Sequence, residues 1–191
     1  MIKEEKLEED ETLVSYDVKA LYPSVPQEDA LNIIKDLLHQ DKELYKRTPM
    51  KAESIVTLLK ICVENTYFTC LMRIFIQVDG SAIGANTSGF AADIFMYRLE
   101  KNALETFANP PTLWKRYVDD TFAKLKKKDV DSFMNHLNAQ HTRIILIFTS
   151  EVLKDNKLAF LDTEINVTEE RGIKIKIYKK PTHTDQYLLF D

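Results

Sequence analysis

The sequence predicts an α+β fold in which helices cover one face of a mainly antiparallel sheet. The expected helices and strands are interspersed without the regular alternation of parallel βαβ units. Short β-prone runs follow one another closely enough to form hairpins, and residues 173–177 alternate strictly between isoleucine and lysine. We therefore expect the second face of the sheet to stay open, where a substrate can lie.

Residue patterns in the first half of the chain predict one strand, three helices and a hairpin. Apolar side chains at helical spacing identify the helices, and alternating β-branched and aromatic residues identify the hairpin. In chain order, the expected elements are a strand at 12–16 ending at Asp17, helices after Pro26 and after Pro49, a hairpin at 66–78 and a helix from about 89 to 107.

The second half is expected to contain more strand than helix. Asn109-Pro110-Pro111 ends the long helix, because proline excludes the helical conformation from the residue before it. The expected elements are a hairpin at 113–125, a helix with Val130, Phe133, Met134 and Leu137 on one face, and strands at 143–149, 158–167 and 172–178.

Composition excludes several classes of protein. Only 4 Gly, 6 Pro and 2 Cys among 191 residues exclude collagen-like and disulfide-rich chains, and 45% hydrophobic residues exclude a disordered one. The longest uncharged aliphatic run, 144–148, is far shorter than the ~20 residues that span a bilayer. The first residues lack the apolar stretch of a secretory signal, and Cys62 and Cys70 lack companions at metal-ligand spacing. We expect reduced, buried thiols and an intracellular protein, nuclear or cytoplasmic, without a membrane.

Charge is unevenly distributed along the chain. Residues 1–11 contain six acids and two bases, which accounts for the whole net charge of −4 and leaves the remainder neutral. We expect this acidic segment to be disordered. Basic residues cluster at 124–128 and at 171–180, where they form either solvated element ends or a stripe that faces phosphates.

Two adjacent aspartates separate the β-prone runs 114–118 and 121–123. A tight hairpin would place Asp119 and Asp120 together at its tip, although two-residue turns usually contain Asn-Gly or Asp-Gly. One Asp-Asp pair is about what chance produces in such a chain, so the pair is weak evidence by itself. Asp17 also ends an expected strand, and neighbouring strands would bring the three carboxylates together.

Such a carboxylate cluster is unfavourable unless cations neutralise it, because like charges at short range raise each other's pKa. Mg²⁺ prefers oxygen ligands and also binds substrate phosphates. Two ions about 4 Å apart can activate an attacking hydroxyl and stabilise the leaving oxygen in phosphoryl transfer. The residues alone leave two interpretations open, a nucleotidyl-transfer site and ordinary acids in surface turns.

Four ordered motifs resemble those of reverse transcriptases and span about residues 12–190. Asp17-Val18-Lys19-Ala20-Leu21-Tyr22, followed by Pro-Ser-Val-Pro, resembles the first motif of the polymerase palm, and Tyr117-Val118-Asp119-Asp120 resembles the YxDD motif. Between them, residues 80–89 and the following helix are similar to the loop-helix motif of these enzymes. Residues 160–162 and 180–188 resemble the closing stretches of Penelope-like retroelement polymerases.

The resemblance implies an RNA-directed DNA polymerase that extends a DNA primer on an RNA template with dNTPs. It implies two Mg²⁺ ions, with Mn²⁺ able to substitute, and a polymerase palm in which the fingers are largely missing. The implied domains are a partial palm at 12–178 and a connection at 179–191, which follow the acidic segment at 1–11 that charge predicts to be disordered. The oligomeric state is not implied.

The resemblance also implies roles for individual residues. Catalysis and metal binding are assigned to Asp17, Asp119 and Asp120, with the Val18 carbonyl as an extra ligand. Tyr22 would pack under the sugar of the incoming nucleotide, and Gly84 would allow close approach of the backbone. Phe160 and Leu161 would grip the primer, and either Lys154 or Lys157 would protonate the departing pyrophosphate.

Departures from the family keep other interpretations open. Prolines usual near Asn86 and Gly89 are absent, Ser88 is left to cap the helix, and Phe75 replaces a common tyrosine. Without fingers and thumb, the isolated chain is expected to be weakly active or inactive. One alternative is a non-catalytic or decayed retroelement remnant that at most binds nucleic acid. A nucleotidyl cyclase or similar transferase is another, but it leaves 180–188 and Tyr22 unexplained.

Overall fold

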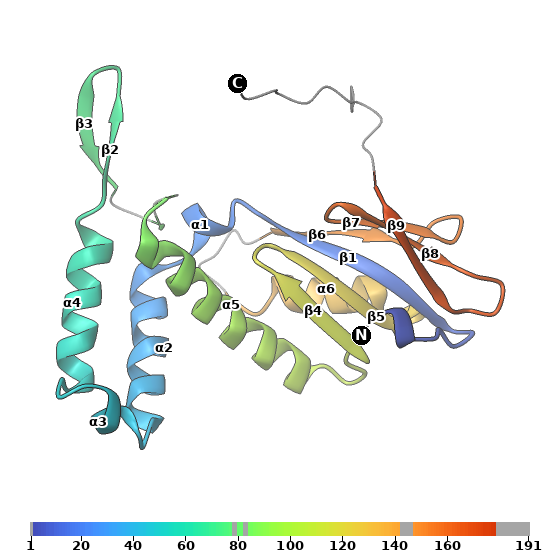
Figure 1. Ribbon diagram of the computed structural model, residues 1–191, viewed down its shortest axis with the longest axis horizontal. Helices are drawn as coiled ribbons and strands as arrows, with labels where there is room; N and C mark the ends of the chain where they lie inside the picture. Colours follow the sequence, from blue (N-terminus) through green and yellow to red (C-terminus); the bar gives the residue numbers. More distant parts are fainter. Residues whose placement is uncertain (1, 78–79, 82–83, 142–146, 179–191) are drawn as a thin grey trace, which may run out of the picture. The chain divides into compact units, whose positions relative to one another are not determined.

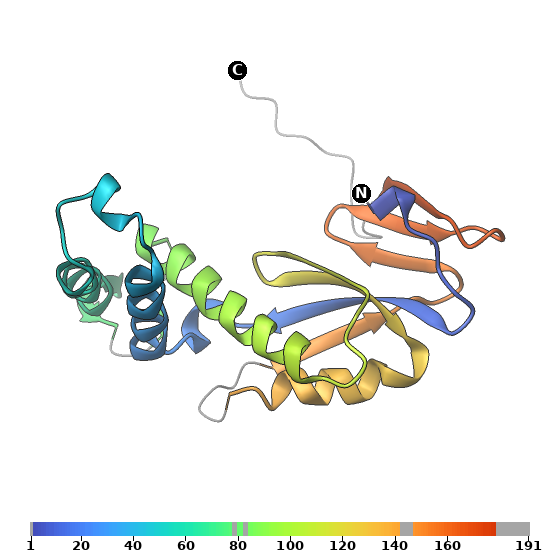
Figure 2. The same cartoon turned by 90° about the horizontal axis from the view of Figure 1, so that it is seen from below.

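A computed structural model describes residues 2–77, 80–81, 84–141 and 147–178, which form two compact units interleaved along the chain. The sheet unit comprises residues up to Asp17, Asn109–Ser132 and the chain from Thr149 onward. The helical unit comprises Val18–Ala108 and Phe133–Phe148. Figures 1 and 2 show the elements of both units, and each unit is described by itself below.

Four strands form the main sheet, in the order β4-β5-β1-β6. β1 (Glu11–Lys19) pairs antiparallel with β5 (Asp120–Lys126), which also pairs antiparallel with β4 (Leu113–Tyr117). The described part of β6 runs over Ile147–Val152, whereas most of the strand expected at 143–149 lies outside the described residues. β1 is longer than expected, so Asp17 lies within the strand and not at its end.

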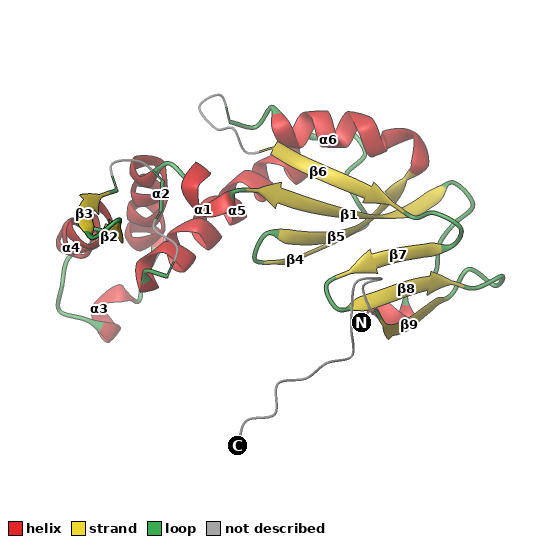
Figure 3. Cartoon of the chain, turned by 90° about the horizontal axis from the view of Figure 1, so that it is seen from above, coloured by secondary structure: helices red, strands yellow, loops and turns green. Residues whose placement is uncertain are grey.

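A second antiparallel sheet follows in the order β7-β8-β9 (Figure 3). It consists of β7 (Lys157–Phe160), β8 (Thr163–Val167) and β9 (Ile173–Ile177). The single strand expected at 158–167 is therefore wrong. Leu161 adopts a left-handed φ of 53°, which turns the chain so that Phe160 pairs with Thr163.

An apolar cluster joins the second sheet to one face of the main sheet. Its buried members are Leu7, Leu13, Phe122, Leu158, Ile165 and Ile173. The rings of Phe122 and Phe160 lie 5.5 Å apart between their centroids. The expected open face is therefore covered in part, at Leu13 and Phe122, whereas Asp17 and Asp120 on the same face remain at least partly exposed.

The acidic N-terminal segment is packed, which differs from the disordered tail that its charge predicts. Residues Ile2–Glu4 form a 3₁₀ helix, and Leu7 is buried in the apolar cluster. The Lys124 ammonium lies 2.6 Å from the Glu5 carboxylate, and Lys126 pairs with both Glu8 and Asp10 at 3.0 and 2.7 Å. Acids of the segment thus neutralise the basic cluster of β5, which a charge count along the sequence does not reveal.

The opposite face of the main sheet is also buried. The Tyr16 ring is fully buried, and its centroid lies 5.6 Å from that of Trp114. Burial raises the pKa of the Tyr16 phenol, and Asp131 in the first turn of α6 (Val130–Asn138) raises it further. A helix therefore begins on this side of the sheet, and the predicted α+β class with antiparallel sheets is confirmed.

The helical unit is built on α5 (Asn86–Thr106), which packs against α1, α2 and α4. The three helices predicted for the first half of the chain are confirmed, with two short helices in addition. The remaining elements are α1 (Leu21–Ser24), α2 (Gln27–Gln40), α3 (Leu44–Arg47), α4 (Ala52–Glu64), β2 (Tyr67–Cys70) and β3 (Arg73–Ile76).

Both cysteines are exposed, so the prediction of buried thiols is wrong. Cys62 lies on a side of α4 that also exposes Leu58 and Ile61, because α4 buries Ala52 and Val63 instead. Cys70 lies in the exposed β2–β3 hairpin. Within the described residues, no helix is long and apolar enough to cross a membrane.

Candidate active site

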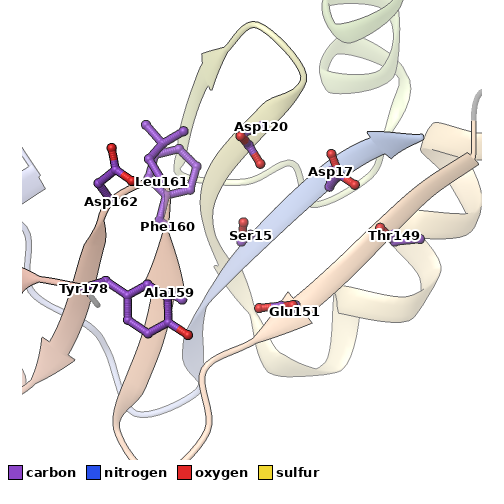
Figure 4. A pocket seen from close by; sticks show the side chains of 10 residues that line it. All are labelled: Ser15, Asp17, Asp120, Thr149, Glu151, Ala159, Phe160, Leu161, Asp162 and Tyr178. Carbon is purple, nitrogen blue, oxygen red and sulfur yellow. The ribbon is translucent and has the colours of Figure 1, made fainter. Parts of the chain in front are cut away.

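Asp17 and Asp120 face each other directly across β1 and β5. The register pairs Asp17 with Asp120 and Tyr16 with Thr121, so both carboxylates project from the same side of the sheet (Figure 4). Directly opposed residues in an antiparallel pair have Cβ atoms about 4.5–5.5 Å apart. The convergence of two carboxylates from distant parts of the chain is thus a property of the strand pairing.

Asp119 lies beside this pair in the turn between β4 and β5. Tyr117 pairs with Asp120, so the two turn residues are Val118 and Asp119, one position earlier than the Asp119-Asp120 tip that the sequence predicts. Val118 takes the left-handed position with a φ of 57°, which is rare for a β-branched residue. The Arg116 guanidinium donates a hydrogen bond of 3.1 Å to the Val118 carbonyl and so supports this turn.

The electrostatics of the carboxylates favour a bound cation. Burial raises the pKa of Asp120, and the negative charges of Asp119 and Asp17 raise it further. The described residues that line the adjoining pocket include no lysine, arginine or histidine to neutralise these charges. Their oxygen donors suit a hard divalent ion. No three acidic, histidine or cysteine side chains in the described ranges gather closely enough to hold a metal by themselves, so water and substrate oxygens would have to complete the coordination.

A pocket of about 570 Å³ opens over the carboxylates (Figure 4). Phe160 and Leu161, which the resemblance assigns to the primer grip, line its other side at the β7–β8 turn. The pocket therefore joins three separate chain segments that contain predicted site residues. Its lining residues are Ser15, Asp17, Thr149, Glu151, Asp120, Ala159, Phe160, Leu161, Asp162 and Tyr178.

Several of these lining residues were not predicted as part of the site. Ser15 lies two residues before Asp17 in β1, so the two-residue period of a strand identifies it once the strand is known. Glu151 was missed because β6 continues beyond the expected end at 149. Tyr178 reaches the pocket because its backbone N–H donates a 2.9 Å hydrogen bond to the Asp162 carbonyl, a contact without a sequence signal.

The predicted nucleotide-binding residues Tyr22 and Gly84 and the predicted metal ligand Val18 belong to the helical unit. Val18 follows Asp17 in β1, and Tyr22 is half-buried in α1. Gly84 has a left-handed φ of 93°, a conformation that favours glycine, while its close approach to a nucleotide stays a prediction. Ser88 lies inside α5, whose N-cap is Ala85, so the expectation that Ser88 caps this helix is wrong.

The structure does not favour either candidate for the proton-donating lysine. Lys154 and Lys157 pair with each other through their backbones at the start of β7, and neither lines the pocket. The Lys157 ammonium lies 3.9 Å from the Glu164 carboxylate. The motif at 180–188 lies outside the described residues.

Comparison with solved structures shows the fold. Apo telomerase from Candida tropicalis matches 92% of this chain with a TM-score of 0.69 at 15% identity, and this match covers 33% of that chain. Telomerase from Candida albicans in complex with a fragment of telomeric RNA matches 87% with a TM-score of 0.69 at 13% identity, over 30% of its length. The Candida tropicalis enzyme with the corresponding RNA fragment matches 93% with a TM-score of 0.62 at 17% identity, over 32% of its length.

Telomerase is related to reverse transcriptases, so the chain has a reverse transcriptase-like fold. It spans about a third of the length of these telomerase chains. No protein-family model matches the sequence. No curated protein matches it either.

Proposed function

We propose that this chain is part of the palm of an RNA-directed DNA polymerase, of the Penelope-like retroelement type that its closing motifs resemble. The observation that carries the proposal is the direct pairing of Asp17 with Asp120, beside Asp119, at the open end of a reverse transcriptase-like sheet. The likeness to telomerase supports the fold to which these carboxylates belong.

The proposed reaction joins the 3′-hydroxyl oxygen of a DNA primer to the α-phosphorus of a dNTP and releases pyrophosphate. Asp17, Asp119 and Asp120 would hold two Mg²⁺ ions, with the Val18 carbonyl as an extra ligand. When bound, such ions neutralise the phosphates and favour ionisation of the primer hydroxyl. The main contribution of the protein would be orientation and electrostatic preorganisation.

The pocket supplies a place for the primer end. Phe160 and Leu161 face the carboxylates from the β7–β8 turn and offer apolar contacts to a sugar or base. Leu161 is 42% exposed although it is large and apolar. Its left-handed backbone holds the side chain at the turn, where a primer strand can contact it.

A decayed polymerase remnant that binds nucleic acid without catalysis is the second candidate function. The observation that favours it is the helix that follows the loop containing Gly84. The first turn of α5 contains Gly89 and no proline, and no side chain caps the helix. This start of α5 is less preorganised than the proline-containing motif of the family. A remnant would keep the fold and lose turnover.

Primer extension on an RNA template distinguishes the two candidates. The purified chain is incubated with dNTPs and Mn²⁺, and wild type is compared with Asp119→Ala and with Asp36→Ala, a control at an exposed position of α2. We expect weak extension by wild type and by the Asp36 variant, and none by Asp119→Ala.

Equal extension by wild type and Asp119→Ala would exclude the assigned role of the carboxylates. If no variant extends the primer but all retain the same affinity for the RNA–DNA duplex, this chain binds nucleic acid without catalysis, as the remnant would. Extension that depends on Asp119 would exclude it.

A further inference from the structure

A short segment of the helical unit, Gly80-Ser81, packs against the backbone of α1. The Ser81 backbone N–H donates a hydrogen bond of 2.7 Å to the Tyr22 carbonyl. Gly80 has a left-handed φ of 67°, and a Cβ built on it would lie only 2.2 Å from the Pro23 carbonyl oxygen. Glycine is therefore required at residue 80 for two independent reasons, the backbone conformation and the close approach.

Gln27 makes the third contact to this segment. Its side-chain amide nitrogen donates a hydrogen bond to the Gly80 carbonyl and lies 3.5 Å from the Val63 carbonyl at the end of α4. One amide thus connects the beginning of α2, the end of α4 and the 80–81 segment. Carbonyl oxygens can only accept hydrogen bonds, so this position needs a donor, and glutamine supplies two N–H groups.

These contacts connect residues with different roles in the proposed polymerase. Tyr22 is the residue that the resemblance places under the sugar of the incoming nucleotide, and its backbone is bonded to Ser81. The 80–81 segment also lies in the loop that carries Gly84 toward α5. A shift of this segment would therefore move the backbone of Tyr22.

We propose that Gln27 is a positioning residue that, together with Gly80, holds the Tyr22 backbone and thereby sets the preference for deoxyribonucleotides over ribonucleotides. This inference rests on the proposed function. Discrimination by a ring that excludes a 2′-hydroxyl requires the ring to keep its place. The three contacts of the 80–81 segment provide that constraint without touching the nucleotide.

The first measurement is the hydrogen-exchange rate of the Ser81 amide in wild type, Gln27→Glu and Gly80→Ala. Glutamate has nearly the shape of glutamine but cannot donate to the Gly80 carbonyl. We expect protection of the Ser81 amide to fall at least about 5-fold in both variants, because Gln27→Glu loses the hydrogen bond to the Gly80 carbonyl and Gly80→Ala adds a Cβ that collides with the Pro23 carbonyl. Gln27→Glu keeps the test valid if Gly80→Ala fails to fold.

Two controls match these substitutions. Gln40→Glu makes the same charge change at an exposed position of α2. Ser81→Ala removes a buried hydroxyl that has no hydrogen-bond partner among the residues described, and it retains the backbone N–H. Both controls should keep the wild-type protection of residue 81.

The second measurement compares the binding of dATP and ATP, each with Mg²⁺, by ligand-observed NMR. We expect wild type to bind dATP more tightly than ATP. In Gln27→Glu the ratio of the two affinities should fall about 5-fold. If Gln27 had a merely structural role, its substitution would weaken the binding of both nucleotides equally. Unchanged Ser81 protection would overturn the proposed contact, and lost protection with an unchanged preference would overturn the role in specificity.

Failure of the proposed function can be distinguished from failure of the role assigned to Gln27. If wild type binds neither nucleotide, the polymerase assignment and the role in sugar selection both fail. The exchange rate of the Ser81 amide then still decides whether Gln27 holds the segment.

Discussion

Asp17 and Asp120 occupy an unfavourable arrangement for two carboxylates. Like charges directly opposite each other across a strand pair destabilise a sheet. The pKa of Asp120 is raised in the sheet unit. Burial is the first cause, and the negative charges of Asp119 and Asp17 add to it. The folded state therefore tolerates an electrostatic cost that a bound cation would remove.

We predict that Asp120→Asn stabilises the metal-free protein at pH 7 by a few tenths of a kcal/mol, because it removes a partly exposed charge from this group. A carboxyl whose pKa is raised by folding binds protons more readily in the folded state, so its cost is present at neutral pH and absent well below pH 4. Urea unfolding at pH 7 and at about pH 3 measures the difference.

The advantage of Asp120→Asn should be present at pH 7 and disappear at the lower pH. Asp36→Asn, at an exposed position of α2, controls for the general loss of one negative charge. A variant that is less stable than wild type at pH 7 would show that Asp120 makes a favourable interaction in the folded protein.

At the scale of elements, α5 begins without good helix signals. Gly89 lies in the first turns of this helix, and a Cβ built on it meets no atom within 4 Å. Glycine within a helix costs roughly 0.5–1 kcal/mol relative to alanine. Replacement of Gly89 by alanine should therefore stabilise the protein.

We expect Gly89→Ala to raise the free energy of unfolding by about 0.5–1 kcal/mol, measured by urea denaturation. Gly84→Ala is the contrasting variant. A Cβ at Gly84 also meets open space, but its φ of 93° is unfavourable for alanine, so this variant should be less stable than wild type. Equal effects of the two substitutions would show that backbone conformation does not decide the outcome.

The β2–β3 hairpin exposes large apolar side chains on both of its strands. Leu71 and Met72 form its turn with left-handed φ values of 49° and 59° and are almost fully exposed. Such a hairpin is prone to self-association because its edges and its side chains are both available. Two-residue turns with both φ values positive favour Asn-Gly.

We therefore predict that the double substitution Leu71→Asn, Met72→Gly lowers self-association and leaves the melting temperature unchanged or higher. Light scattering as a function of protein concentration measures the association. The matched control is Asn156→Gly in the Asp155-Asn156 turn, which has similar left-handed φ values but is already polar. Asn156→Gly should not change the association. If the double substitution also leaves the scattering unchanged, the association does not arise from the β2–β3 hairpin.

At the scale of the whole molecule, the sheet unit depends on a segment that its composition assigns to a tail. Leu7 is 7% exposed within the apolar cluster, and the neighbouring acids bind the lysines of β5. Residues 2–11 therefore belong to the folded structure. Their charge count does not show this, because the acids find basic partners more than a hundred residues away.

Leu7→Ala should lower the free energy of unfolding by about 2–3 kcal/mol, through lost apolar burial and the cavity left behind. Thermal unfolding followed by circular dichroism measures the change. Glu9→Ala, in the same segment, is the control, since the Glu9 side chain is highly exposed and its ion pair with Arg171 contributes little. A cost near zero for Leu7→Ala would restore the picture of a disordered tail.

Much of this fold, but only part of the candidate site, could be predicted from the sequence. Helices with a regular apolar stripe, such as α2, are predictable because helical periodicity is a local property. The convergence of Asp17 with Asp120 required an assumption that β1 and β5 are neighbours, and strand pairing is not local. Leu161 illustrates a further limit, because a non-glycine residue in a left-handed turn gives no sequence signal that separates β7 from β8.

Divalent-ion binding by the carboxylates is the central claim, and titration of Mn²⁺ followed by electron paramagnetic resonance tests it most directly. Wild type is compared with Asp17→Asn and Asp120→Asn, and with Asp36→Asn as the control. We expect Asp17→Asn and Asp120→Asn each to weaken Mn²⁺ binding at least about tenfold, because each removes one charged oxygen ligand, while the control matches wild type. Equal binding by all four proteins would contradict the assignment of a metal-dependent polymerase site to these residues.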